Sequence, residues 1–231
     1  STVVVSGGTL DLGGNADTVA GVQQTGGTIQ NGTLTSTTAF DMQAGTASAN
    51  LAGAVGLDKT TAGTTTLSGT NTYTGTTTVS AGNLNLNSAG TAIAGNLTVA
   101  GGTATLQAAD QIADGKNVVV TSGTLDVASF NDTVNGVQIT GGTITGTTGA
   151  LTSTTAFDLQ AGTVSAILGG TAGANKTTAG TVTLSKTNTY TGATTVSAGT
   201  LTLGHATNTL ADASTVVVSG GTLDLGGNAD T

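Results

Sequence analysis

This 231-residue chain contains no cysteine, no proline and no tryptophan, and neither arginine nor glutamate occurs in it. Without cysteine there is no disulfide framework, no thiol nucleophile and no cysteine-based metal site. The absence of proline suits a backbone whose N–H groups are nearly all needed in strand ladders. The lack of cysteine fits a bacterial protein that is exported unfolded, although it is equally compatible with the cytoplasm.

Charge is scarce and mostly acidic. Four lysines and twelve aspartates give a formal net charge of −8. No basic patch is available to neutralise phosphate groups, which excludes binding to nucleic acid or to anionic lipid. No stretch has the pattern of a signal peptide or of a transmembrane helix. We therefore expect no nucleic-acid partner and no direct insertion of this segment into a membrane.

A short signature recurs along the whole chain: a small residue and a glycine, then threonine or asparagine, then usually an aliphatic residue. Successive signature glycines lie 18 to 22 residues apart. These glycines are Gly8, Gly27, Gly45, Gly63, Gly82, Gly102, Gly123, Gly142, Gly162, Gly180, Gly199 and Gly221. Twelve similar steps indicate one structural unit stacked many times.

Each step reads as two strands joined at the glycine. In the first copy, Val3 and Val5 alternate with other residues before the turn, and Leu10 and Leu12 alternate after it. The rest of each step has a weaker apolar pattern, which predicts a third, shorter strand with loops. We expect the glycines at a bend between closely stacked strands, because such a bend often needs a positive φ and a Cβ would be costly there. The sequence thus predicts an all-β fold, a right-handed parallel β-helix of about twelve rungs with about 19 residues per rung.

Longer repeats support this interpretation. Residues 2–12 resemble residues 117–127, and residues 214–231 repeat residues 1–18 letter for letter. The long units are therefore about 1–115 and 116–213, with a restart at 214. The second unit lacks the turn around Gly102 and has two extra residues near Thr147. Loss of a whole rung is what a stacked coil tolerates, so we expect residues 1–231 to form a single β-helix cut from a longer array.

Two stretches resemble the autotransporter-associated β-strand repeat. Residues 64–86 read TTTLSGTNTYTGTTTVSAGNLNL and residues 181–203 read TVTLSKTNTYTGATTVSAGTLTL. The family pattern places Asn, Tyr, Gly, Val, Gly, Leu and Leu at positions that these stretches match. The matching residues are Asn71, Tyr73, Gly75, Val79, Gly82, Leu84 and Leu86, and Asn188, Tyr190, Gly192, Val196, Gly199, Leu201 and Leu203. Lys186 stands where the pattern has glycine.

The resemblance implies a passenger segment of a large bacterial surface protein, forming a β-helical stalk. It brings no catalytic residue and no cofactor. We therefore expect a non-enzymatic structural stalk or fibre, located outside the cell or at its surface, that supports adhesion, aggregation or matrix formation. The expected partners are other copies of the chain, joined end to end or laterally, and cell-surface or glycan ligands.

A carbohydrate-active β-helix is one alternative, and it would require clustered carboxylates. Asp11, Asp126 and Asp224 occupy equivalent positions in separate rungs, and Asp41 and Asp158 lie one long repeat apart. We expect these carboxylates to be solvated or to cap turns. His205, the only histidine, has no suitably spaced catalytic partner. Asp17 and Asp230 end GGNAD segments, but no tandem calcium-binding nonapeptide is present. No catalytic, metal or cofactor site is predicted.

Three further predictions concern particular side chains. Lys59 and Lys176 lie one position off the inward register and are expected to point to solvent. Four aromatic residues recur with the long repeat, and we expect core packing, with a glycan-stacking surface as the alternative; they are Phe40, Phe157, Tyr73 and Tyr190. Five rungs read Thr-x-Thr after the glycine, a pattern that raises ice binding as another alternative, although aspartate, glutamine and asparagine interrupt it.

Overall fold

The computed structural model describes residues 1–207, 209–212 and 214–228. The chain is an all-β parallel solenoid of about twelve turns, about 19 residues apart, which confirms the predicted fold class. Among the described residues there is no helix. The chain divides into two compact units, Ser1–Lys116 (unit 1) and Asn117–Thr231 (unit 2), which are described separately. A single β-helix across residues 1–231 stays a prediction.

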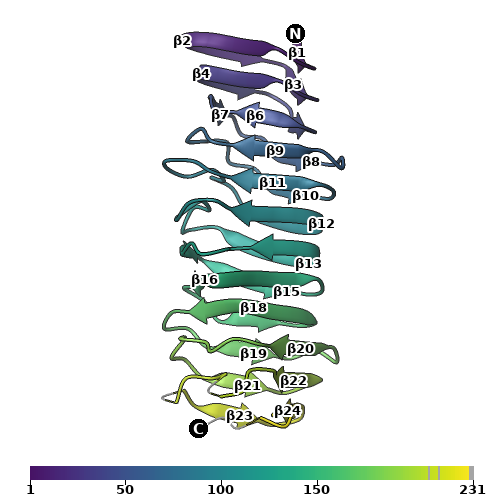
Figure 1. Cartoon of the computed structure of the whole chain (residues 1–231), viewed down its shortest axis with the longest axis vertical. Coiled ribbons are helices and arrows are strands. Elements are labelled where there is room, and N and C mark those ends of the chain that lie inside the picture. The colour runs from purple at the N-terminus through teal and green to yellow at the C-terminus, as the bar shows by residue number, and fades with distance from the viewer. Residues whose placement is uncertain (208, 213, 229–231) are drawn as a thin grey trace. The chain divides into compact units, whose positions relative to one another are not determined.

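Unit 1 contains twelve strands, stacked as Figure 1 shows in purple to teal. Their bounds are β1 (Thr2–Val5), β2 (Thr9–Val19), β3 (Gly21–Gln24), β4 (Thr28–Ser36), β5 (Phe40–Met42), β6 (Gly45–Ala47), β7 (Asn50–Ala52), β8 (Leu57–Lys59), β9 (Thr64–Leu67), β10 (Thr77–Val79), β11 (Asn83–Leu86) and β12 (Leu97–Leu106).

Unit 2 also contains twelve strands among its described residues. Their bounds are β13 (Asn117–Asp126), β14 (Asp132–Val134), β15 (Gly136–Ile139), β16 (Thr143–Ser153), β17 (Phe157–Leu159), β18 (Gly162–Gly169), β19 (Ala174–Lys176), β20 (Thr181–Leu184), β21 (Thr194–Val196), β22 (Thr200–Leu203), β23 (Val216–Val218) and β24 (Thr222–Asp224).

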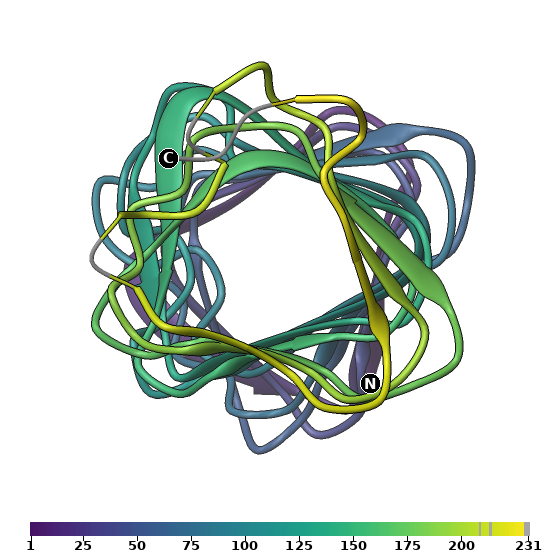
Figure 2. The same ribbon diagram turned by 90° about the horizontal axis from the view of Figure 1, so that it is seen from below.

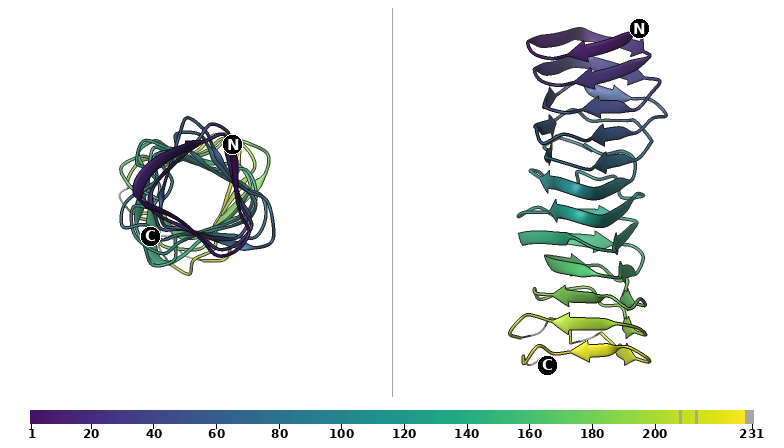
Figure 3. Two further views of the ribbon diagram at one scale, coloured as in Figure 1. Left: turned by 90° about the horizontal axis from the view of Figure 1, so that it is seen from above. Right: turned by 90° about the vertical axis from the view of Figure 1, so that its right-hand side faces the viewer.

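Every strand pair is parallel, and each unit has three sides. The first side holds the strands before the signature glycine: β1, β3, β5, β8, β10 and β12 in unit 1, and β13, β15, β17, β19, β21 and β23 in unit 2. The second side holds those after it: β2, β4, β6, β9, β11 and β12, then β13, β16, β18, β20, β22 and β24. Within one unit, the coils lie one above another (Figure 3).

The predicted inward columns form the core. Side chains three residues before the glycine and two after it are almost all buried, including Met42, Val79, Ile144 and Leu201, each 0% exposed. Viewed along the coils, the strands of a unit surround a centre (Figure 2). The burial of these side chains places them inside it. Val218, which was expected inward, is 49% exposed because β23 pairs only with β21 among the described residues.

The third side is also confirmed as part of the core, but it is not always a separate strand. Its aliphatic and tyrosine side chains are all at least 94% buried: Val19, Leu34, Tyr73, Ile93, Ile112, Val134, Leu168, Tyr190 and Leu210. In β2, β4, β16 and β18 the second and third sides join into one long strand. Residues 70–74 contain no strand, so there the third side is a loop anchored by its buried side chains.

The signature glycines lie where successive turns approach closely. A Cβ on Gly142 would lie 2.6 Å from the Gly123 carbonyl oxygen, and one on Gly102 would lie 2.7 Å from that of Gly82. Positive φ, which glycine adopts at low cost, occurs at eight of the twelve: Gly8, Gly27, Gly45, Gly82, Gly123, Gly142, Gly162 and Gly199. The other four have an ordinary φ, so their backbone conformation does not require glycine. At Gly102, glycine is required by the close approach of the neighbouring turn.

Candidate functional site

The motif asparagines join three successive turns. Asn71 is 2% exposed. Its Oδ1 accepts a hydrogen bond from the Leu51 N–H at 2.8 Å, and its Nδ2 donates to the Ala92 carbonyl at 2.7 Å. Leu51 belongs to the turn before Asn71 and Ala92 to the turn after it. The side chain therefore replaces strand pairing where the third side has become a loop.

Asn188 repeats this arrangement in unit 2. Its Oδ1 accepts from the Leu168 N–H at 2.9 Å, and its Nδ2 donates to the Thr209 carbonyl at 2.9 Å. Each asparagine therefore satisfies one backbone group in the turn before it and one in the turn after it. Leaving such a buried backbone group unpaired would cost about 1–3 kcal/mol.

The motif tyrosines are core residues, which confirms the core interpretation of the four aromatic side chains. Tyr73 and Tyr190 are 0% exposed. The Tyr73 hydroxyl bonds to Thr77 Oγ1 at 2.6 Å, and its ring centroid lies 6.0 Å from that of Phe40. Tyr190 bonds to Thr194 at 2.8 Å, and its centroid lies 5.8 Å from that of Phe157. Burial raises the pKa of the Tyr73 hydroxyl. These rings offer no surface on which a glycan could stack.

The prediction that Lys59 and Lys176 point to solvent is wrong: both are 0% exposed. Lys59 lies opposite Val79 in register, and Lys176 lies opposite Val196, so both occupy the inward column. The prediction failed because the turn after each lysine has one extra residue. Three residues lie between Lys59 and Gly63, whereas two lie between Val79 and Gly82.

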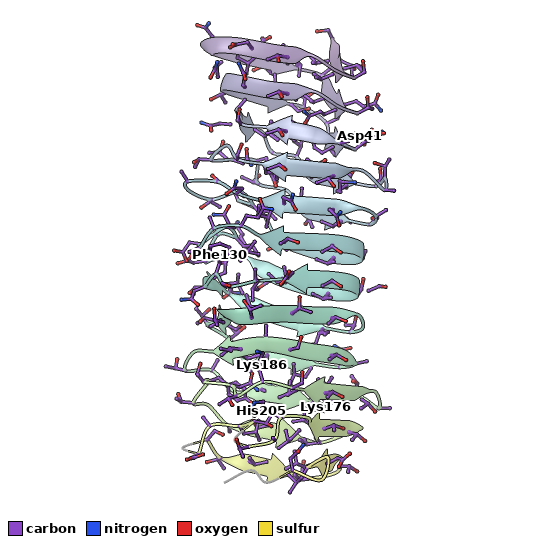
Figure 4. The ribbon with its side chains drawn as sticks, viewed as in Figure 1. Asp41, Phe130, Lys176, Lys186 and His205 are labelled. Carbon is purple, nitrogen blue, oxygen red and sulfur yellow. The ribbon has the colours of Figure 1, made fainter. Side chains whose placement is uncertain are left out.

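Each buried ammonium group satisfies carbonyl oxygens of two turns. Lys59 Nζ donates to the Thr61 carbonyl in its own turn and to the Ala81 carbonyl of the next turn at 3.2 Å. Lys176 Nζ does the same with Thr178 and with Ala198, at 3.3 Å for the latter (Figure 4). Burial lowers the pKa of both ammonium groups, and the nearby carboxylates of Asp41 and Asp158 partly offset this.

The outward aspartates are held by the chain itself. Asp41 Oδ2 accepts hydrogen bonds from Gln23 and Gln43, each at 2.8 Å. Asp11 accepts hydrogen bonds from Gln30, the Gly13 N–H and Asn31, and these bonds lower the pKa of its carboxyl. Asp126 and Asp224 cap the same turn in their own rungs, through the N–H groups of Ala128 and Gly226. The turn-capping expectation is confirmed for these three.

The remaining candidates are His205, Asp17 and Asp230, and the structure describes the surroundings of the first two. His205 Nδ1 contacts the Thr207 carbonyl and, at 3.5 Å, Thr187 Oγ1, rather than a carboxylate (Figure 4). Asp17 bonds to the N–H of its neighbour Thr18. Asp230 lies outside the described residues. Within the described part of the chain, no group of three or more histidine, cysteine, aspartate or glutamate residues could hold a metal ion. No helix found there is long and apolar enough to cross a membrane.

The departure at Lys186 is linked to the insertion near Thr147. Lys186 Nζ donates to the Thr147 carbonyl at 3.1 Å, across 39 residues of sequence. In unit 1 the equivalent residue is Gly69, where an added Cβ would collide with the Ala49 carbonyl oxygen. A hydrogen bond therefore connects two differences between the long repeats that lie far apart in sequence.

Comparison with known proteins agrees with the sequence resemblance. The passenger-associated-transport-repeat family model matches residues 57–86 and 175–203. These are the two segments that hold the buried asparagine, tyrosine and lysine residues, and the predicted resemblance is confirmed. No curated protein and no solved structure matches the chain.

Proposed function

Because the chain carries two copies of a passenger-associated transport repeat, we propose that it is a non-enzymatic structural segment of an extracellular bacterial protein. Its role is that of a stalk or fibre that supports adhesion, aggregation or matrix formation. The family match supports a secreted or cell-surface location, and a parallel solenoid is a suitable architecture for an extended support.

One observation carries this proposal: the polar side chains of the motif face inward. Asn71 and Tyr73, like Asn188 and Tyr190, bond to the backbone or to threonine inside the coil. A motif that served a reaction would present its polar groups to a substrate. Here the asparagines hold one turn to the next and the tyrosine hydroxyls bond within their own turn, so the motif describes a way of building and stacking turns.

A cellular experiment tests the structural role directly. In the bacterium that produces the full-length protein, residues 116–213 are deleted, which removes one long repeat. We expect the shortened protein to reach the cell surface, as measured by antibody labelling of intact cells, and cell aggregation or surface attachment to decrease. Normal aggregation and attachment with normal labelling would contradict the proposal.

A carbohydrate-active role is tested separately. Purified chain is incubated with acidic and neutral polysaccharides, and release of reducing ends is measured. We expect no turnover. Turnover that is abolished by Asp41→Asn or Asp158→Asn, but not by Asp224→Asn, would overturn the non-enzymatic assignment.

One structural observation favours testing ice binding as well. A two-residue register shift places Thr163 opposite Thr183, which extends an outward rank of hydroxyl groups in unit 2. The rank contains Thr124, Thr143, Thr163, Thr183 and Thr202. Asp224 ends it, and Asp126 interrupts the neighbouring rank. Thermal hysteresis of the purified chain is the measurement, and under the structural proposal we expect none.

A further inference from the structure

A groove of about 250 Å³ opens on the first side of unit 2. Asn117 and Val119 of β13, Gly136 and Gln138 of β15, and Thr155 and Asp158 of the next turn line it. Gly136 keeps the groove open, because a Cβ there would lie 3.0 Å from both Asn117 Oδ1 and Thr155 Oγ1. The groove thus exists because Gly136 has no side chain between the polar side chains of Asn117 and Thr155.

The groove combines an apolar wall with a fixed carboxylate. Asp158 Oδ2 accepts hydrogen bonds from Gln138 Nε2 at 2.6 Å and from Gln160 Nε2 at 2.8 Å. None of the described residues donates to Oδ1, so that oxygen keeps its acceptor capacity. Val119 and Ala156 supply the apolar lining. A carboxylate held by two amides is preorganised, which reduces the cost of binding a donor.

Unit 1 repeats the same set of residues. Each of the nine lining residues has a counterpart there, and the only difference is Thr2 in place of Asn117. Val4, Gly21, Gln23 and Asp41 correspond to Val119, Gly136, Gln138 and Asp158. Gln23 and Gln43 fix the Asp41 carboxylate as the two glutamines fix that of Asp158. Seven of the nine lining residues of unit 2 are not buried and contribute little to the core, and their recurrence supports a role in binding.

Charge indicates which ligand the groove fits. The chain has no arginine, and two of its four lysines are buried in turns. Buried Lys176, which interacts electrostatically with Asp158, donates hydrogen bonds to the Thr178 and Ala198 carbonyls. The outer face of the carboxylate therefore has no cation of its own in the described part of the chain, and the exterior is predominantly acidic.

We propose that this groove binds an alkylammonium or alkylguanidinium group, with the cationic head on the Asp158 carboxylate and the aliphatic stem along Val119, and that the equivalent residues of unit 1 bind such a group in the same way. Such a group is the side chain of a lysine or arginine on a partner protein, or a free polyamine. The site is independent of the stalk role, because a stalk without it would still form.

The test is a titration of the ¹⁵N-labelled 231-residue chain followed by amide chemical shifts. The probes are Nα-acetyl-arginine amide, Nα-acetyl-lysine amide and spermidine, with Nα-acetyl-norleucine amide as the uncharged control. We expect saturable shifts in β13, β15 and β17 and at the equivalent residues of unit 1. Response to the amino-acid amides assigns the source to a partner side chain, and response to spermidine alone assigns it to a polyamine.

Variants make the result specific. Asp158→Asn should weaken binding in unit 2 at least tenfold and leave unit 1 unchanged, whereas Asp224→Asn, an equal charge change elsewhere, should alter neither. Asp158 also faces buried Lys176, so Val119→Lys provides a second variant that keeps the carboxylate and fills the groove with its own cation. Equal shifts with the norleucine control, loss of binding in Asp224→Asn, or undiminished unit 2 binding in Val119→Lys would each overturn the proposal.

Discussion

Lys59 lies directly opposite Val79 in the parallel ladder between β8 and β10, so a lysine fills one place in a mostly apolar column. Its ammonium group bends back to the carbonyl oxygens of two turns. Gln24 occupies the same column two strands earlier and donates to Gly27 and Thr46 carbonyls at 3.1 and 3.0 Å. Side-chain donors inside the coil thus recur as partners of the turn carbonyls, and they need not carry a charge.

This relationship predicts an order of stability among variants of Lys59. Lys59→Gln keeps a donor for the carbonyl groups and removes the buried charge, whereas Lys59→Met leaves both carbonyls unpaired. We expect the glutamine variant to be more stable than the methionine variant by about 1–3 kcal/mol, the cost of an unsatisfied buried group. Urea unfolding of both proteins measures the difference. A methionine variant as stable as the glutamine variant would show that these bonds contribute nothing.

The buried lysines also predict a pH dependence. Burial lowers the pKa of Lys59 and Lys176 below the ordinary value of 10.5. Near and below pH 10 the unfolded chain therefore binds more protons than the folded chain, and the free energy of unfolding rises as the pH rises toward 10.5. The pKa of buried Tyr73 is raised, so its effect on the free energy of unfolding has the opposite sign. Its contribution to stability is complete below about pH 10 and declines only above that pH.

Urea unfolding between pH 8 and 10 measures this rise. The double variant Lys59→Gln, Lys176→Gln should lack it, while Lys116→Gln, which changes a lysine outside the buried pair, should retain it. A stability that falls with pH in the parent protein over this range would contradict the assignment.

Asn71→Ala should destabilise the chain by about 1–3 kcal/mol or more, because the Leu51 N–H and the Ala92 carbonyl both lose their partner. Asn87→Ala is the matched control, since Asn87 is an exposed asparagine directly after the same motif copy. Thermal or urea unfolding gives the comparison. Equal effects of the two substitutions would show that Asn71 does not join the turns.

Ala128→Gly should stabilise the chain. Ala128 has φ of 51°, whereas Gly13 and Gly226, at the equivalent turn position, both have φ of 61°. The left-handed conformation costs a non-glycine residue about 1–2 kcal/mol, and the added backbone entropy of glycine takes back about 0.5–1 kcal/mol, so we expect a net gain of about 0.5–1 kcal/mol. Gly13→Ala is the reciprocal variant and should lose stability. Destabilisation by Ala128→Gly would show that the backbone at Ala128 is not strained.

The isolated 231-residue polypeptide should self-associate, as expected from its repeat. β23 pairs only with β21 among the described residues, and its valines Val216, Val217 and Val218 are 38%, 43% and 49% exposed. An open parallel edge with apolar side chains favours pairing with another copy. Sedimentation velocity across a concentration series measures this, and Val217→Lys should reduce it. A monomer at all concentrations would contradict the expectation.

Periodicity in the sequence was sufficient to predict the fold class and the inward columns, because side chains of a stacked strand alternate with period two. It failed at Lys59 and Lys176, where one extra turn residue moves the strand by one place relative to the glycine. Counting back from the glycine assumes turns of constant length. The apolar residues flanking each lysine, Leu57 and Ala174, carried the correct register, because they lie two positions away on the same face.

The candidate site was less accessible to sequence reasoning. The motif tyrosines and asparagines were recognised by spacing, but only the structure shows that Asn71 bonds to the turns before and after it. The groove at Gly136 was missed because its residues come from three turns and its centre is a missing side chain. Comparing the two long repeats position by position would have shown that Gly21 and Gly136 recur with the same polar neighbours.

The most direct test of the stacked, in-register coil is cysteine cross-linking, which the absence of native cysteine makes unambiguous. Thr78 of β10 lies opposite Thr98 of β12, and neighbouring strands are about 4.8 Å apart, within the Cα separation of a disulfide. Under mild oxidation, Thr78→Cys with Thr98→Cys should form a disulfide within one chain, detected by mass spectrometry. Thr78→Cys with Asn85→Cys, closer in sequence but out of register, should not. Cross-linking of the second pair and not the first would contradict the parallel solenoid.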